Sequence, residues 1–148
     1  EPLHYKGTRF HRVIPGFCVQ GGQTFENEEG SGGESIYGHA FEDENLRVKF
    51  KSAGMLAMAN GGPDSNGSQF FITTAEADHL SFKCVGFGEV IEGMQVVRAI
   101  ESIGTLNGEV KQNAVVLDCG MLDFEEGEQE RLDQRNTRGG VDLTQRND

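Results

Sequence analysis

The chain alternates short β-prone runs with glycine-containing turns, and this alternation restricts it to a mostly β architecture. Its 21 glycines follow no regular period, which excludes a collagen-like repeat and favours turns between strands. Asn-Gly pairs at 60–61, 66–67 and 107–108 predict turns with a positive φ. A polar, glycine-rich loop is predicted at 26–38. The runs predicted as strands are residues 8–14, 54–59, 69–74, 85–90 and 113–119.

One helix is predicted from apolar periodicity. Val96, Ala99, Ile100 and Ile103 recur at helical spacing and would form a single apolar stripe. Gly104 follows as the expected first residue beyond the helix, where a left-handed backbone commonly ends it. We therefore expect a β domain, such as a barrel, with a helix packed against it.

Residues 1–122 are predicted to form one domain, and residues 123–148 differ from them in composition. The 148-residue chain is long enough for one domain with its own core. Residues 123–148 hold eight acids, four arginines and few large apolar side chains. We interpret them as an acidic, disordered tail or linker with a short helical stretch near 125–135.

Charge and cysteine content limit the partners and the location. The net charge of −11 makes nucleic acid and anionic membrane surfaces poor partners. Apolar runs are too short to span a bilayer. The three cysteines at 18, 84 and 119 have no close pairing, which argues against a disulfide framework. A reducing compartment is favoured, and we expect a cytoplasmic protein, although any targeting segment would precede Glu1.

Several kinds of chemistry lack their sequence signatures. There is no G-x-S-x-G elbow, and the stretches at 30–35 and 86–93 match neither a phosphate-binding loop nor a dinucleotide fingerprint. The histidines show no metal-ligand spacing and there is no C-x-x-C, so no metal site is expected. Thiol chemistry stays open because Cys84 and His79 are close in sequence, although a buried thiol without catalytic role is the more frequent case.

An arginine within an apolar strand face is the most unusual feature. Phe10, Arg12 and Ile14 alternate along one predicted strand, so they share a face. A charge among apolar neighbours is costly unless it is paired or used, which leaves a salt bridge at a strand edge or a functional role for Arg12. Taken singly, the aromatic and amide residues that could accompany it are better explained as core or turn residues: Phe17, Gln20, Asn60, Gln69 and Phe71.

These residues lie in motifs that resemble the cyclophilin family. FHRVIPGFCVQGG at 10–22 looks like the family signature. It is followed in order by GSGGESIYG (30–38), FEDEN (41–45), MANGGPDSNGSQFFIT (58–73), VGFGEVIEGMQVV (85–97) and DCG (118–120). The resemblance covers about residues 2–122, and several long motifs in the correct order are far more specific than one short pattern.

The resemblance implies a fold, an activity and a site. The fold is a closed antiparallel barrel of about eight strands capped by two helices. The activity is isomerisation of the peptide bond before proline, which breaks no bond and needs no nucleophile, metal or cofactor. Arg12 corresponds to the catalytic arginine, and Phe17, Phe71 and Leu80 correspond to walls of the proline pocket. The groups that would hold the substrate backbone or line the groove are Gln20, Asn60, Gln69, Ala59 and Gly61.

Three predicted substrate-binding positions depart from the family pattern. Cys18 stands where an apolar residue such as methionine is common, which makes one pocket wall smaller. His79 stands where many members carry a tryptophan that contacts cyclosporin-type drugs, and this implies reduced affinity for such ligands. Cys84 stands where many members carry a histidine that closes the site, and a thiol is smaller and a weaker hydrogen-bond donor.

The resemblance also sets expectations for partners and completeness. Proline-containing peptides and unfolded protein clients are the expected partners of a monomeric folding helper. The two strands and the helix that usually precede residues 1–7 are missing, so we expect an N-terminally incomplete barrel with exposed sheet edges. A proline-peptide binding module with weak or no turnover is therefore the alternative function.

Overall fold

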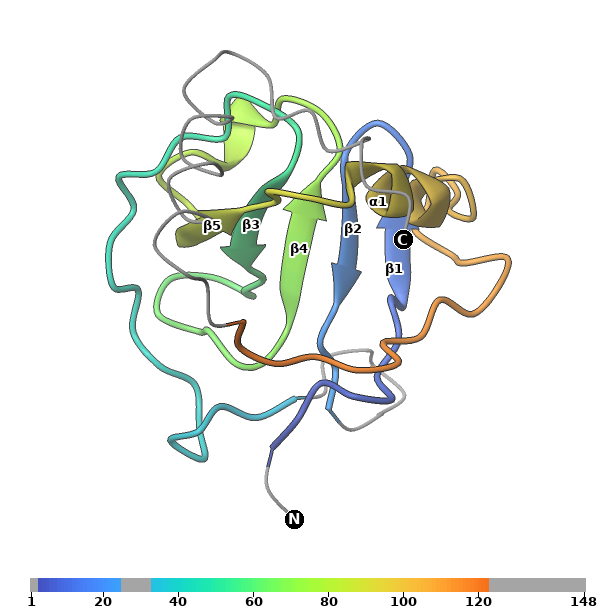
Figure 1. The fold of residues 1–148 in the computed structure, drawn as a ribbon. Helices are drawn as coiled ribbons and strands as arrows, with labels where there is room; N and C mark the ends of the chain where they lie inside the picture. The colour runs from blue at the N-terminus through green and yellow to red at the C-terminus, as the bar shows by residue number, and fades with distance from the viewer. Residues whose placement is uncertain (1–2, 25–32, 123–148) are drawn as a thin grey trace.

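A five-stranded antiparallel sheet forms the centre of the fold. The computed structural model describes residues 3–24 and 33–122. The strands lie side by side in the order β1-β2-β4-β3-β5 (Figure 1). The strands are β1 (Arg12–Ile14), β2 (Cys18–Gly21), β3 (Met55–Met58), β4 (Phe70–Thr73) and β5 (Gly86–Glu89). The helices of the described residues are a short 3₁₀ helix, η1 (Asp78–Leu80), and an α-helix, α1 (Met94–Glu101).

The mostly β class is confirmed. The sheet does not close into a barrel in the described residues, so the closure that the family resemblance implies is wrong for them, whereas an open sheet agrees with the expectation of an incomplete barrel. β1 and β5 end the sheet, and they do not pair with each other. The outer edge of β1 is bonded to a turn instead of a strand. Val13 N–H donates to the Gly108 carbonyl at 3.1 Å, and Thr105 N–H donates to the Val13 carbonyl at 3.2 Å. The turn therefore provides hydrogen-bond partners for the outward-facing backbone N–H and C=O of Val13, without adding a strand to the sheet.

Four of the predicted strand runs contain strands, namely β1, β3, β4 and β5. The run at 113–119 contributes one isolated bridge, between Arg9 and Val115, and lies beside residues 7–10 through a few backbone hydrogen bonds. Strand β2 was not predicted from the sequence. It follows β1 after a tight turn in which Gly16 has a φ of +78°, a conformation that glycine adopts without steric cost.

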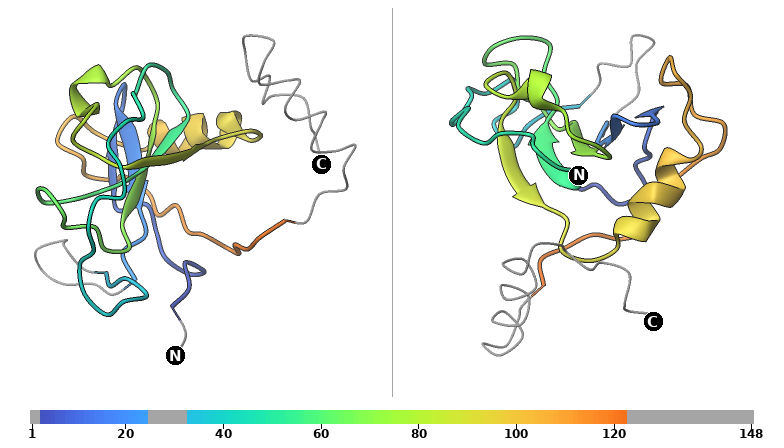
Figure 2. Two further views of the ribbon diagram at one scale, coloured as in Figure 1. Left: turned by 90° about the vertical axis from the view of Figure 1, so that its left-hand side faces the viewer. Right: turned by 90° about the horizontal axis from the view of Figure 1, so that it is seen from above.

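One face of the sheet is apolar and packs against α1. Val13 and Val19 are cross-strand partners on β1 and β2, and both are 0 % exposed. They form a cluster with Val97 of α1, and Ile72 packs against it from β4. Figure 2 shows α1 lying along this face beside β1 and β2. Burial of each valine stabilises the fold by about 1.5–3 kcal/mol, which anchors the helix to this half of the sheet.

The helix buries a different side from the one predicted. Val96 is 57 % exposed and Ala99 is also exposed. Val97 is buried instead, with Met94 and Ile100 packed beside it. The sequence contains two overlapping apolar series that share Ile100, and helical periodicity alone does not decide between them. The position of the sheet decides which series is buried.

Gly104 has a packing role in place of the predicted helix-ending role. The helix is capped by Ser102 in a right-handed conformation, and Gly104 does not have a positive φ. A Cβ atom at position 104 would collide with the backbone of Val13. The absence of a side chain therefore lets the segment after α1 approach β1 closely.

The Asn-Gly prediction holds at one of its three positions. Gly108 has a φ of +91°, as predicted. Gly61 and Gly67 have no positive φ, and in the first of these turns the left-handed residue is Gly62. The loop between Gly61 and Gly67 is shaped by side-chain hydrogen bonds. The Asn-Gly rule does not include such bonds.

Two further predictions concern residues that the structure does not describe. The interpretation of residues 123–148 as an acidic tail, and that of residues 26–32 as part of a polar loop, lie outside the described residues. In residues 3–24 and 33–122, neither helix combines the length and the apolar character needed to cross a bilayer.

Candidate active site

A row of side chains crosses the sheet on the face opposite α1. The antiparallel register pairs Arg12 of β1 with Gln20 of β2, Gln20 with Phe71 of β4, and Phe71 with Ala57 of β3. Directly paired residues point to the same face, with Cβ atoms roughly 4.5–5.5 Å apart. The register therefore places a guanidinium, an amide and an aromatic ring next to one another.

Arg12 is exposed at one end of this row and rests against a glycine turn. Its Nη1 donates to Gln20 Oε1 at 3.2 Å. A Cβ atom at Gly108 would lie 2.9 Å from Arg12 Cγ, so the turn forms a close wall beside the side chain. Within the described residues Arg12 makes no ion pair, which removes the salt-bridge explanation for its position there. A guanidinium has five N–H donors, so several can still meet an incoming group.

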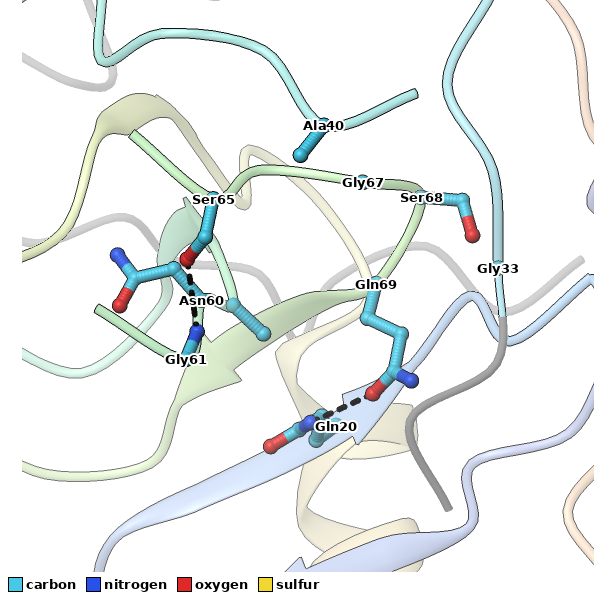
Figure 3. A pocket seen from close by; sticks show the side chains of 10 residues that line it. Gln20, Gly33, Ala40, Asn60, Gly61, Ser65, Gly67, Ser68 and Gln69 are labelled. Atoms are coloured by element: carbon cyan, nitrogen blue, oxygen red, sulfur yellow. Dashed lines mark hydrogen bonds between the residues drawn. The ribbon is translucent and has the colours of Figure 1, made fainter. Parts of the chain in front are cut away.

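Gln20 is held between Arg12 and a second amide. Its Nε2 donates to Gln69 Oε1 at 2.8 Å (Figure 3). The Gln69 main chain is fixed in turn, because its carbonyl accepts a hydrogen bond from Ala59 N–H at 3.0 Å. The Gln20 oxygen faces Arg12 and its nitrogen faces Gln69, so this chain of bonds fixes the direction of the amide.

The other end of the row is apolar. Phe71 is 5 % exposed and belongs to a buried cluster, against which half-buried Phe17 and Leu80 pack. Beneath it lies Phe50, which is 0 % exposed, with the two ring centroids 6.1 Å apart. The exposed His79 ring lies 5.3 Å from that of Phe17. The predicted walls of a proline pocket therefore meet in one cluster next to Arg12 and Gln20.

Asn60 follows β3 and uses its side chain to join two loops. Its Nδ2 donates to the Lys83 carbonyl at 3.1 Å, and its Oδ1 accepts from Gly62 N–H at 3.3 Å. The Asn60 main-chain N–H and C=O form no hydrogen bond within the described residues. They can therefore pair with an extended peptide, in the way that an exposed strand edge does.

A pocket of about 360 Å³ lies beside this polar end. Figure 3 shows Gln20, Asn60 and Gln69 around it, with the two glutamines joined by their hydrogen bond. The sequence analysis did not predict all of its wall: Ser65, Gly67 and Ser68 lie in the same motif as Asn60 and Gln69, whereas Gly33 and Ala40 come from the preceding segment. The full set that lines the pocket is Gln20, Gly33, Ala40, Ala59, Asn60, Gly61, Ser65, Gly67, Ser68 and Gln69.

The family model of cyclophilin-type peptidyl-prolyl cis-trans isomerases (Cyclophilin type peptidyl-prolyl cis-trans isomerase/CLD) matches residues 2–121. The chain belongs to this isomerase family. In this cyclophilin-type domain the match includes every residue of the row and of the adjoining pocket. The predicted site residues occupy one continuous region of the fold, which includes the apolar cluster with Cys18 and Cys84 and the contact of His79 with Phe17.

The two site thiols of the cyclophilin-type domain are buried and poorly suited to nucleophilic chemistry. Cys18 is 1 % exposed, and burial raises its pKa to about 11, although the Arg12 charge acts in the opposite direction. Burial, and after it the charge of Asp43, raises the pKa of Cys84 as well. A reactive thiol needs a lowered pKa, and the polar neighbour of Cys84 is the Asn60 amide, 3.9 Å away, in place of His79. The geometry therefore argues against a thiol enzyme.

A carboxylate of α1 supports the turn between β1 and β2, and sequence reasoning missed it. Glu101 Oε2 accepts a hydrogen bond from Gly16 N–H at 2.9 Å, and Oε1 pairs with Arg98 Nη1 at 3.0 Å. Burial alone would raise the pKa of Glu101, but hydrogen bonds from Thr74, Gly16 and Arg98 outweigh burial and lower the pKa. The hairpin that carries Arg12 is thereby tied to the helix.

No group of three or more His, Cys, Asp or Glu side chains in the described residues of this cyclophilin-type domain could hold a metal ion.

Proposed function

We propose that this cyclophilin-type domain accelerates rotation about X–Pro peptide bonds in proline-containing peptides and unfolded protein chains. The observation that carries the proposal is the register that sets Arg12, Gln20 and Phe71 side by side on one face of the sheet. The reaction breaks no bond, so a donor beside an apolar surface is sufficient machinery.

The barrier to be lowered is the resonance of the amide. Rotation about the bond costs roughly 18–20 kcal/mol because the C–N bond has partial double-bond character. In the twisted transition state the lone pair is localised on the prolyl nitrogen. A donor from the Arg12 guanidinium stabilises that lone pair, and Gln20 and the Gly108 turn hold the donor in place before the substrate arrives. One preorganised donor contributes about 10²–10³ in rate.

The rest of the site restrains one side of the substrate. The proline ring would lie on the apolar cluster, with Phe71 as the floor and Phe17 and Leu80 at the edge. The free main-chain groups of Asn60 would pair with the substrate backbone on one side of the bond. With that side held, thermal motion of the other side becomes rotation about the X–Pro bond.

The exposed position of Arg12 favours a second candidate function, a proline-peptide binding module with weak or no turnover. Arg12 lies on an edge strand, and one amide at 3.2 Å is the side-chain partner that orients its guanidinium. The apolar cluster and Asn60 can bind a peptide without a fixed guanidinium, whereas catalysis requires one.

Two measurements on the full 148-residue chain separate the candidates. Cis–trans exchange of a short proline peptide is followed by NMR with and without the protein, and the affinity for the same peptide is measured by titration. Isomerisation predicts binding together with faster exchange. Binding without faster exchange would support the second candidate, and the absence of both would contradict the proposal.

We also propose that cyclosporin-type ligands bind this domain with reduced affinity. The exposed His79 ring contacts Phe17 at the edge of the apolar cluster, where an imidazole offers a large apolar ligand less surface than an indole. The substitution His79→Trp should tighten binding in a competition titration. Equal affinities of the two proteins would contradict this role of His79.

A further inference from the structure

Neither the backbone conformation of Phe82 nor the exposure of its ring stabilises the fold. Its φ is +67°, and its side chain is 63 % exposed, between η1 and β5. A left-handed backbone is unfavourable for a bulky residue, whereas glycine or asparagine adopts it readily. An exposed ring also gains little from burial. Strained residues of this kind cluster at functional sites, because function retains them against their cost.

Phe82 lies directly beside the proposed site. Lys83, the next residue, accepts the hydrogen bond of Asn60 Nδ2 at 3.1 Å through its carbonyl. Lys83 N–H and Cys84 N–H both donate to the carbonyl of Leu80, at 3.0 and 3.3 Å. The tight turn between two residues of the apolar cluster therefore carries Phe82 outward at the edge of the site.

Positive charge gathers around this ring. Lys49 Nζ lies 6.0 Å from the ring centroid of Phe82, and Lys83 is exposed next to it in the chain. Lys51 is also exposed and pairs with Asp78 at 3.0 Å. Three of the five lysines of a chain with net charge −11 are thus placed within or beside this one region. Because Asp78 neutralises Lys51, Lys49 and Lys83 are the two ammonium groups left to attract an acidic partner at this ring, and the nearest carboxylate that acts on the neighbouring Cys84 is Asp43.

We propose that Phe82, Lys49 and Lys83 form an interaction surface, the Phe82 rim, for an acidic and apolar segment next to the proline of a bound peptide. This inference rests on the proposed function of the adjoining site. The ring supplies apolar contact and the ammonium groups pair with one or two carboxylates. A longer polyanion such as nucleic acid would extend beyond the local charge and meet the net negative charge of the domain.

The first test uses two proline peptides that differ only in a Glu or a Gln, with the acid placed on either side of the proline in separate pairs. At low salt the full chain should bind the Glu peptide of at least one pair about fivefold more tightly than the Gln peptide, the ratio expected for about 1 kcal/mol. Lys49→Gln should bring this ratio close to one. Lys111→Gln, which changes an exposed lysine elsewhere, should leave the ratio unchanged.

A second variant tests whether the Phe82 ring contributes to binding although its left-handed backbone is strained. Phe82→Asn should raise the melting temperature or leave it unchanged, because asparagine tolerates the left-handed backbone, and it should still weaken binding of the Glu peptide. Unchanged binding of the Glu peptide by Phe82→Asn, at any melting temperature, would overturn the assignment of Phe82. So would equal affinities for both peptides in every pair, or equal losses in Lys49→Gln and Lys111→Gln.

The Gln peptides separate this inference from the function on which it rests. If the wild-type chain binds and isomerises them but shows no preference for Glu, the Phe82 rim is wrong and the proposed function stands. If it neither binds nor isomerises them, the proposed function fails as well.

Discussion

Gly108 lies against the Arg12 side chain, so close that an added Cβ atom would come within 2.9 Å of Arg12 Cγ and 3.4 Å of its Nε. The Gly108 carbonyl also accepts the hydrogen bond of Val13 N–H, next to Arg12 on β1. The turn at Gly108 therefore fixes both the strand that carries Arg12 and the space that its side chain occupies. Arg12 is positioned by a segment almost a hundred residues away in the chain.

The first prediction follows from this contact. Gly108→Ala should displace the Arg12 guanidinium and lower the isomerisation rate by about 10- to 100-fold, while proline-peptide affinity changes little. Gly93→Ala is the matched control, because Gly93 has a similar φ of +88° but an added Cβ atom would meet nothing within 4 Å. Because the two glycines have similar φ, both variants place alanine in the left-handed region, and only Gly108→Ala also contacts Arg12.

The same contact predicts a coupling that can be measured. In a protein that already carries Arg12→Ala, the further change Gly108→Ala should have little additional effect on turnover, because it acts through Arg12. If the two losses are independent, Gly108 does not act as a positioning residue.

The second prediction concerns the support of the apolar cluster. Phe50→Ala should lower the free energy of unfolding by about 3–5 kcal/mol, because Phe50 is 0 % exposed beneath Phe71. Phe87→Ala, at a position that is 56 % exposed, should cost far less. Urea denaturation of the three proteins provides the comparison, and similar costs for the two variants would show that Phe50 does not support the site.

The third prediction concerns the hydrogen-bonded Glu101. Its folded pKa is lowered, so its charge stabilises the fold above the unfolded pKa of about 4.3, and this stabilisation is lost as the pH falls through the folded pKa. Glu101→Gln should lower the free energy of unfolding by about 1 kcal/mol near neutral pH. The difference from wild type should shrink in strong acid, where the carboxyl is protonated.

Glu76→Gln, at an exposed position, is the control for Glu101. A difference between wild type and Glu101→Gln that persists unchanged in strong acid would show that the charge of Glu101 does not contribute. The measurement is a series of urea titrations over pH.

The fourth prediction concerns the thiols. At neutral pH an alkylating reagent should label the exposed Cys119 first, and Cys18 and Cys84 only on unfolding, because burial raises the pKa of both site thiols. Mass spectrometry of time points identifies the labelled residue. Rapid labelling of Cys84 in the folded protein would reopen the thiol chemistry that the geometry argues against.

Sequence reasoning located most of the strands, and the family resemblance selected the candidate site residues, but neither specified how these residues are arranged in space. Local β propensity locates β1, β3, β4 and β5. Local β propensity does not locate β2, because Cys18 to Gly21 is a short run that is stabilised as a strand by pairing with β1 and β4. The hydrogen bond between Gln20 and Gln69 joins residues 49 positions apart, so it depends on the register and not on either local sequence.

Other features follow from packing that no local pattern specifies. Val97 is buried in place of Val96 because the sheet lies on that side of α1. Phe50 and Phe82 are both phenylalanines between polar or charged neighbours, yet one is fully buried and the other 63 % exposed. Both the strand pattern and the family resemblance predict a barrel, but the described residues form an open sheet, because closure depends on pairing between strands distant in the chain.

Arg12 is the residue on which the proposed isomerisation depends most directly, and one comparison of variants tests its role. Exchange rates and affinities for a proline peptide are measured on the wild-type chain, Arg12→Ala and Arg12→Lys. Arg12→Ala should lose about 100-fold or more in isomerisation while its affinity changes only a few-fold, and Arg12→Lys should restore little, because an ammonium lacks the guanidinium geometry. Near-normal exchange catalysed by Arg12→Ala would contradict the assignment of Arg12 as the group that stabilises the twisted bond.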